Sequence, residues 1–475
     1  MRHPVSKLVA VAALPALLAW SASALWAQAG GAGTSQGTQS PPAAAAPKDF
    51  TLPAKHEFAL PNGLRVTLVP YGRLPLATVS LVVRTGSIDE GPPQVWLAKL
   101  MGDFLQQGTT TRSAAEVAQA VAGMGGDLAI TVGDDESTIG GAVLGDSAAP
   151  FVRLVADIIE HPSFPDSQLP RLKNDRLREL AIAQTRPQEI AQERFAAQLY
   201  PDHPYGRLFP TEDALKGYTA AQVRDFYGHN VSAARAHLYV VGQFSAGDVE
   251  RVVREAFGDW AAGAPPTVNV PTPRAERTVV LIDRPGAVQS TIALGLPVPD
   301  PSQPDWVGLQ VTDALLGGSF GSRITSNIRE QKGYTYSPFS FIDTKYRSAV
   351  WAEGADVTTN VTGASLKEIF GEIDRLRSEA PPADEVRGIQ NYLAGTFVLR
   401  SSTQAGLARQ FGFVDLHGLG DDYLTSYVRH VYALTPADVQ RIAQQYLDPT
   451  KMAIVVAGDK KTVADQLAPY GRVVQ

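Results

Sequence analysis

The sequence predicts an α+β protein made of two homologous copies of one unit, each a mostly antiparallel sheet covered by helices. Three segments of the first half recur in the second half in the same order, and two of these pairs are 216 positions apart. They are 218–223 with 434–439, 238–242 with 454–458, and 78–81 with 290–294. Ordered internal similarity of this kind indicates a duplicated unit. Strand patterns followed by runs of helices indicate the α+β class.

The amino-acid composition excludes several kinds of binding partner and several kinds of site. The 42 Lys and Arg residues are outnumbered by 48 Asp and Glu, and the formal charge is −6. Mild acidity argues against nucleic acids and anionic membrane surfaces as partners. The chain has no cysteine, which excludes disulfides, thiolate metal ligands and lipid attachment through an N-terminal cysteine. An exported chain without cysteine fits the oxidising bacterial periplasm.

The N-terminus has the pattern of a secretory signal. A basic start precedes the apolar run Leu8–Trp20, which is too short to span a bilayer comfortably, and Ala27-Gln28-Ala29 supplies a small-x-small cleavage site. We therefore expect a signal peptide at 1–29, with an uncleaved anchor as the alternative, and a periplasmic protein. Residues 30–49 are rich in Gly, Ala, Pro and Ser, and are expected to form a flexible tether.

The first copy is expected at 50–263, followed by a Pro-rich linker at 264–275 and the second copy at 276–475. Asn62-Gly63 predicts a tight turn between two short strands. Ser113 with Glu116 predicts a capping box that opens a helix ending at Met124. Further strands are expected at 79–84, 127–139, 140–144 and 238–242, and further helices at 148–159, 168–184, 187–200 and 246–257.

The helix at 97–105 organises the first copy. Leu97, Leu100, Met101, Phe104 and Leu105 recur at the spacing of one buried helical face. The opposite face is expected to carry the remaining polar and small positions, which are Lys99, Gly102, Asp103 and Gln106. The simplest interpretation of Lys99 and Asp103 is a solvated ion pair one helical turn apart, worth a few tenths of a kcal/mol.

The segment 86–109 resembles the pitrilysin/insulinase family of zinc metallopeptidases. In that family a strand ending in G-S-x-x-E leads to a helix carrying H-x-x-E-H, whose two His residues bind zinc while the Glu acts as general base. Here the five motif positions read Lys99-Leu100-Met101-Gly102-Asp103. The third family ligand, a Glu, falls on Glu179. The resemblance therefore implies a family member without the zinc motif, with no catalytic and no metal-ligating residue of its own. The spacing of the eight His residues offers no other set of zinc ligands.

A second resemblance covers 322–337. Ser322 is expected to cap a short helix that Gly333 terminates, followed by a strand at 334–341. The sequence SRITSNIREQKGYTYS closely matches the family motif S-R-L-x-x-x-L-R-E-K-x-G-L-A-Y-S. In the family, an Arg and a Tyr of this motif bind substrate across a chamber between the two domains, and these roles fall on Arg329 and Tyr336. The alternative is an Arg that complements the helix dipole and a Tyr packed in the sheet.

Some bacterial members of the family, in the processing-peptidase-like branch, work as pairs in which one chain carries zinc and the other carries the Arg/Tyr motif. The resemblance therefore implies a heterodimer in which this chain is inactive alone and binds the peptide, while the zinc-bearing homologous partner supplies the only metal cofactor. Two alternatives remain open. One is a non-enzymatic peptide-binding or scaffold protein of the same fold, and the other is an active zinc peptidase with an unrecognised ligand set.

Overall fold

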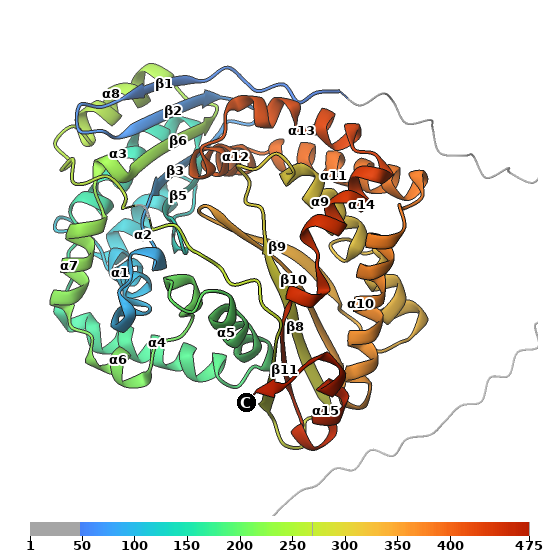
Figure 1. The fold of residues 1–475 in the computed structure, drawn as a ribbon. Helices are drawn as coiled ribbons and strands as arrows, with labels where there is room; N and C mark the ends of the chain where they lie inside the picture. Colours follow the sequence, from blue (N-terminus) through green and yellow to red (C-terminus); the bar gives the residue numbers. More distant parts are fainter. Residues whose placement is uncertain (1–47, 268, 475) are drawn as a thin grey trace, which may run out of the picture. The chain divides into compact units, whose positions relative to one another are not determined.

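Two six-stranded sheets form the framework of the protein (Figure 1). The computed structural model describes residues 48–267 and 269–474. The first sheet has the order β1-β2-β6-β3-β5-β4 and the second the order β12-β7-β11-β8-β10-β9. The strands are β1 His56–Ala59, β2 Arg65–Pro70, β3 Leu76–Val83, β4 Ala129–Val132, β5 Ser137–Leu144, β6 Ala236–Gly242, β7 Thr278–Asp283, β8 Gln289–Val298, β9 Phe339–Lys345, β10 Ser348–Thr358, β11 Ala453–Gly458 and β12 Val473–Val474.

The two sheets are copies of one arrangement. In each, a central strand (β3 or β8) pairs antiparallel with both neighbours, and the next pair (β2 with β6, or β7 with β11) is parallel. They differ at one edge, where β1 pairs antiparallel with β2 and β12 pairs parallel with β7. The predicted duplicated α+β fold with mostly antiparallel sheets is therefore confirmed.

The helices follow the same repeated order. In the first half they are α1 Leu97–Leu105, α2 Ala114–Gly123, α3 Ala148–Glu160, α4 Leu169–Ala183, α5 Pro187–Leu199, α6 Glu212–Gly217, α7 Ala220–Asn230 and α8 Ala246–Ala256. In the second half they are α9 Trp306–Leu316, a π-helix at Thr325–Gln331, α10 Thr362–Ser378, α11 Ala383–Ser401, α12 Gln404–His417, α13 Asp421–Ala433, α14 Pro436–Tyr446 and α15 Lys460–Leu467. In the described part of the chain, no helix combines the length and apolarity needed to cross a membrane.

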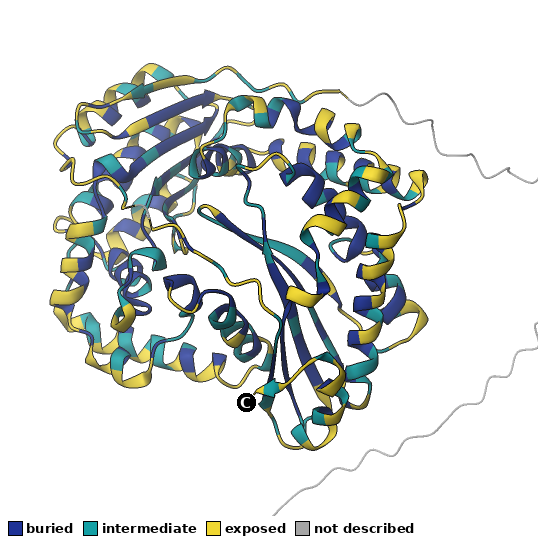
Figure 2. Cartoon of the chain, viewed as in Figure 1, coloured by how far each residue is buried: buried dark blue, intermediate teal, exposed yellow. Residues whose placement is uncertain are grey.

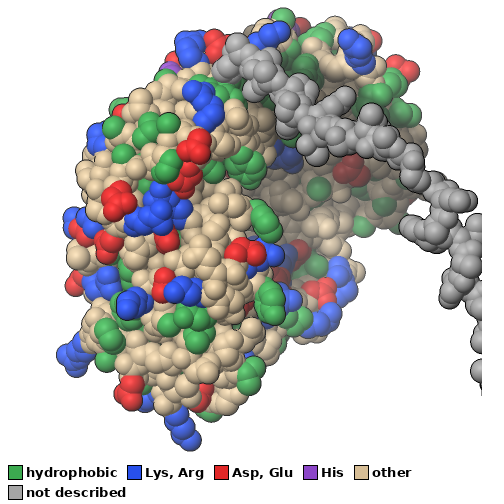
Figure 3. Space-filling view, turned by 90° about the vertical axis from the view of Figure 1, so that its right-hand side faces the viewer, with side chains coloured by type: hydrophobic (Ala, Val, Ile, Leu, Met, Phe, Trp, Pro, Cys, Tyr) green, Lys and Arg blue, Asp and Glu red, His purple; other side chains and the backbone are tan. Residues whose placement is uncertain are grey.

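Each half contributes one helix to the other half's sheet. Helix α5 packs on β8 and β11, where Phe195 and Leu199 join Val350 and Val455 in one apolar cluster. Its counterpart α12 packs on β3 and β6, and the ring of Phe411 stacks on Tyr239 at 6.4 Å. The central strands of both sheets are accordingly buried, while the edge strands β1 and β4 and the outward helix faces are more exposed (Figure 2). The face of the molecule in Figure 3 carries Lys and Arg side chains interspersed with Asp and Glu, in keeping with the small net charge.

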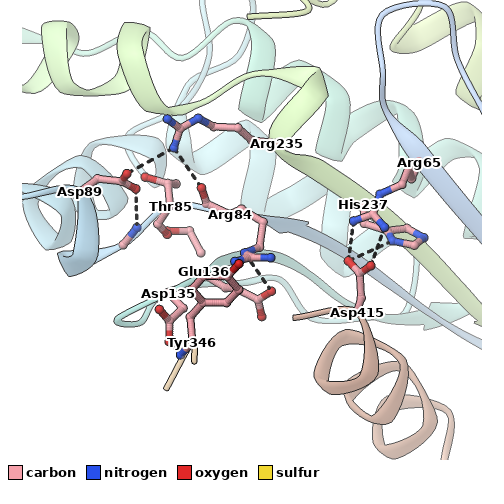
Figure 4. Close-up of polar contacts among 12 residues, drawn as sticks. Arg65, Arg84, Thr85, Asp89, Asp135, Glu136, Arg235, His237, Tyr346 and Asp415 are labelled. Atoms are coloured by element: carbon pink, nitrogen blue, oxygen red, sulfur yellow. Dashed lines mark hydrogen bonds and ion pairs between the residues drawn. The ribbon is translucent and has the colours of Figure 1, made fainter. Parts of the chain in front are cut away.

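Polar contacts reinforce this exchange (Figure 4). Asp415 of α12 accepts hydrogen bonds from both terminal nitrogens of Arg65, each at 2.5 Å, and its Oδ2 lies 3.4 Å from Nδ1 of His237. Burial of Asp415 opposes ionisation, but the hydrogen bonds from His237 and Arg65 outweigh it and hold the pKa of this carboxyl well below its usual value. In the turn after β9, the backbone N–H of Tyr346 donates to Asp135 at 3.0 Å.

Several local predictions are confirmed. Gly63 has φ +93°, as the turn at Asn62-Gly63 requires, and Ser113 and Glu116 form the capping box of α2. Two strand boundaries are wrong. The break expected between residues 139 and 140 lies at 133–136, where charged residues form the β4–β5 turn, and β9 begins at Phe339 rather than 334. The expected signal peptide at 1–29, and the tether up to residue 47, lie outside the described residues.

Replacing Asp415 tests the polar link between the halves. In Asp415→Ala, Arg65 and His237 lose their shared acceptor, and we expect the free energy of unfolding at pH 7 to fall by about 1–3 kcal/mol. Because the folded-state pKa is depressed, this stabilisation is present above the unfolded pKa of about 3.9 and is lost as pH falls below it. Urea unfolding at pH 7 and at lower pH measures both effects. Asp465→Ala, which removes an exposed carboxylate on α15, is the control; equal losses in the two variants would contradict the assignment.

Candidate functional site

A buried carboxylate fixes the start of helix α1. Glu90 accepts hydrogen bonds from the backbone N–H groups of Trp96 (3.1 Å) and Ala98 (2.8 Å), which satisfies donors that a helix N-terminus leaves free. Burial raises the pKa of Glu90 to about 7, although the two N–H donors favour the charged form. Trp96 adopts φ +69°, and its Nε1 donates to the carbonyl of Leu208 at 2.7 Å. Helix α1 is therefore held in one orientation.

The polar face of α1 meets helix α4 in a four-residue ion cluster. Lys99 Nζ lies 3.6 Å from Glu179 Oε1, while Arg176 donates to Asp103 through Nε (2.6 Å) and Nη2 (2.5 Å) and also pairs with Glu179. Burial raises the pKa of Asp103, and the Arg176 guanidinium opposes that rise. The expected Lys99–Asp103 pair is therefore wrong, because each residue takes its partner from α4.

Gly102 lies on a buried side of α1, and its expected place on the polar face is also wrong. The helix passes over the edge strand β4, and a Cβ atom at position 102 would lie 2.7 Å from Cγ2 of Val132. That separation is far below the ordinary contact distance between carbon atoms. A side chain at position 102 therefore requires Val132 to move.

The residues of this ion cluster do not fit a zinc ion. Zinc sites use neutral imidazole, thiolate or carboxylate donors, whereas here two cations already neutralise the two carboxylates. A dication would have to displace Lys99 and Arg176 from both. Across residues 48–267 and 269–474, no group of three or more His, Cys, Asp or Glu side chains is arranged to hold a metal.

A cavity of about 160 Å³ lies beside this cluster, between the two halves of the chain. Lys99 and Glu90 line it from the first half, and Phe341 and Lys345 from the second. The segment His203–Arg207, which resembles the family's H-P-Y-G-R, builds one wall: Tyr205 donates to Asp135 and Arg207 Nη2 donates to the carbonyl of Glu90 at 3.0 Å. Lys345, which pairs with Asp134 and Asp343, was not predicted as a site residue from the sequence.

Arg329 and Tyr336 do not line this cavity. Arg329 sits on the π-helix, pairs with Glu330 at 3.2 Å and stacks over the ring of exposed Phe320 at 4.6 Å. Tyr336 is 87% exposed in the segment before β9, so it is not packed in the sheet. Asn327 anchors the π-helix by donating to Glu368 and Glu372 of α10. A π-turn of this kind is frequent at functional sites.

The chain matches two models of peptidase family M16. Residues 72–210 match "Insulinase (Peptidase family M16)" and residues 217–393 match "Peptidase M16 inactive domain". It is 26% identical over 442 residues to an uncharacterised zinc protease of Mycobacterium bovis, covering 90% of this chain and 97% of that protein. It is 24% identical over 417 residues to one of Streptomyces coelicolor, covering 86% and 90%.

Two solved structures share the fold. A peptidase M16 inactive domain from Pseudomonas fluorescens superimposes with a TM-score of 0.79 at 23% identity, covering 85% of this chain and 98% of that one. A protease from Helicobacter pylori superimposes with a TM-score of 0.81 at 19% identity, covering 86% and 100%.

Substituting Arg176 tests the ion cluster. Arg176→Ala leaves Asp103, whose side chain is only 16% exposed, without its cation, and we expect the free energy of unfolding to fall by about 2–4 kcal/mol. Arg178→Ala on the same helix removes an arginine that is 70% exposed and pairs with Asp175; this matched control should change stability by less than about 0.5 kcal/mol. Urea unfolding measures both, and a loss in Arg176→Ala no larger than in the control would contradict the cluster's role.

Proposed function

This chain belongs to the insulinase family of peptidases (M16), and from that membership we propose that it is the metal-free subunit of a heterodimeric peptidase. In this proposal it binds and orients peptide, and a homologous partner carries the zinc that cleaves it. The observation that carries the proposal is the ion cluster of Lys99, Asp103, Arg176 and Glu179, in which two cations occupy the carboxylates that a dication would need.

Arg329 and Tyr336 are the proposed substrate-binding residues. A guanidinium and a phenol can both donate hydrogen bonds to peptide carbonyls or to a carboxylate. Tyr336 is almost fully exposed, and the face of Arg329 stacks on an exposed phenylalanine, so both groups are accessible to another molecule. Holding a peptide in one orientation lowers the entropic part of the barrier to its hydrolysis, and that is this chain's proposed contribution to catalysis.

The partner and the compartment belong to the same proposal. The partner is a zinc-bearing homologue, and the pair works in the periplasm after cleavage of the signal peptide expected at 1–29. Support comes from the pattern of that segment and from the lack of cysteine. The relatives named zinc proteases raise the competing possibility that this chain itself binds zinc. Two observations argue against zinc binding: the carboxylates at α1 are paired with cations, and a side chain at position 102 would collide with Val132.

The purified mature chain provides the first test. We expect elemental analysis to find far less than one zinc per chain and a peptide-library assay to detect no hydrolysis. Purification from the native periplasm should recover a zinc-bearing homologue together with this chain, and the pair should hydrolyse peptides in a chelator-sensitive manner. Stoichiometric zinc with hydrolysis by the chain alone would overturn the proposal. If no such homologue is recovered, the heterodimer is refuted and the alternative of a non-enzymatic peptide-binding protein is favoured.

Variants of the pair test the Arg/Tyr assignment. Arg329→Ala and Tyr336→Phe each remove a donor to the substrate, and we expect kcat/KM of the pair to fall by about ten- to a hundredfold for Arg329→Ala and less for Tyr336→Phe. Lys332→Ala, which removes a neighbouring exposed cation that pairs with Glu368, is the matched control. Unchanged kcat/KM in Arg329→Ala, with the pair still assembled by gel filtration, would refute the assignment.

A further inference from the structure

A second and larger cavity lies wholly within the second half of the chain. It has a volume of about 720 Å³, within the range of small-molecule binding sites. It runs along β9, the last strand of its sheet, and helices α9, α11, α12 and α13 provide the other walls. Its lining is strongly aromatic and includes Trp306, Phe341, Phe397, Phe413, Tyr423 and Tyr427.

The cavity corresponds to the cleft of the ion cluster in the first half. Helices α9 and α11 stand beside β9 as α1 and α4 stand beside β4, because the two halves repeat one order of elements. In the first half, Lys99 and Arg176 of α1 and α4 form ion pairs with carboxylates across this cleft. Among the described residues, no ion pair joins α9 to α11, and the cavity lies along these two helices.

Two arginines border the cavity from adjoining helices. Arg400 lies near the end of α11 and Arg409 lies in α12, and both side chains are exposed. Within the described residues neither guanidinium has an ion-pair or side-chain hydrogen-bond partner, whereas Arg323, at the start of the π-helix segment, is bound by both oxygens of Glu385 at 2.8 Å. A guanidinium without an acceptor suits a carboxylate, which it can bind through two parallel hydrogen bonds.

Helix α9 supplies acceptors to the same cavity. Gln310 lines it, and its buried Oε1 has no hydrogen-bond donor among the described residues. Asp313 accepts from Ser340 Oγ (2.5 Å) and Trp351 Nε1 (2.9 Å) through Oδ1, while its Oδ2 faces Gly318, where a Cβ atom would lie only 2.5 Å away. The glycine therefore leaves this oxygen uncovered toward the cavity.

A second carboxyl lies behind Asp313 at this end of the cavity. Burial raises the pKa of Asp313 to about 6, against the two donors that favour ionisation. Glu353, completely buried, has a pKa raised well above its usual value by burial and by the charge of Asp313. The surroundings therefore favour the protonated form of Glu353, and the cavity has carboxyl groups at one end and arginines along its border.

We propose that this cavity binds the C-terminal end of a short apolar peptide. The free carboxylate pairs with Arg400 and Arg409, the backbone N–H or the ammonium group donates to Gln310 Oε1 and Asp313, and the apolar side chains pack on the aromatic walls. The inference needs neither zinc nor a partner chain, so it stands or falls separately from the proposed peptidase function.

Binding to the isolated mature chain tests the inference. Isothermal titration calorimetry with the dipeptide Leu-Phe should detect one site, and the C-terminal amide of the same dipeptide should bind about ten- to a hundredfold more weakly because it lacks the charged carboxylate. N-acetyl-Leu-Phe distinguishes the source of the ligand. Binding as tight as that of Leu-Phe assigns the cavity to the ends of longer peptides, and weaker binding assigns it to free dipeptides whose ammonium group reaches Asp313.

Variants at exposed positions keep the test independent of folding. Arg400→Gln and Arg409→Gln should each weaken Leu-Phe binding about tenfold or more and abolish the preference over the amide. Arg387→Gln, on the same helix as Arg400 but stacked over Tyr432 outside the cavity, is the matched control and should bind as the wild type does. No binding of Leu-Phe at millimolar concentration, equal binding of acid and amide, or unchanged binding in both arginine variants would overturn the inference.

Discussion

The reciprocal exchange of helices α5 and α12 is the constraint on which the rest of the structure depends. An amphipathic sheet needs cover on its apolar face, and here one face of each sheet is covered by a helix from the other half. Phe195 and Leu199 are residues of the first half, but they pack against strands of the second half's sheet. The exchange also brings Lys345 and Phe341 beside α1, so the cavity near the ion cluster exists only because both halves are folded together.

Charge balance explains the stability of the ion cluster at α1. Two carboxylates that are both partly buried repel each other and favour protonation. Arg176 bridges Asp103 and Glu179, and Lys99 adds a second cation, so the four groups sum to no net charge. In the second half, Asp313 and Glu353 have no cation partner among the described residues, and burial raises the pKa of both carboxyls. One duplicated framework thus holds two clefts whose carboxylates are stabilised in different ways.

The duplicated fold could be predicted because three segments recur in the same order, and helix α1 because its apolar residues recur at helical spacing. The partners of Lys99 and Asp103 could not be predicted, because Arg176 is 73 positions from Asp103 and only the packing of α4 brings them together. The burial of Gly102 depends on β4 in the same way. Of the two exchanged helices, α5 was predicted as a helix and no helix was predicted at α12, and a helical pattern does not say which sheet a helix covers. The cavity beside β9 had no sequence signal, since its aromatic residues come from four helices and one strand.

The closeness of the Val132 side chain to the backbone at Gly102 limits the substitutions that both positions accept. A carboxylate introduced at position 102 meets a β-branched side chain that has little rotamer freedom, and such overpacking typically costs about 1–3 kcal/mol. A smaller residue at 132 alone would instead leave a cavity beside the helix. Each of these single substitutions is therefore destabilising, and only the two together are compatible. A carboxylate on this turn of α1 thus requires two coordinated substitutions rather than one.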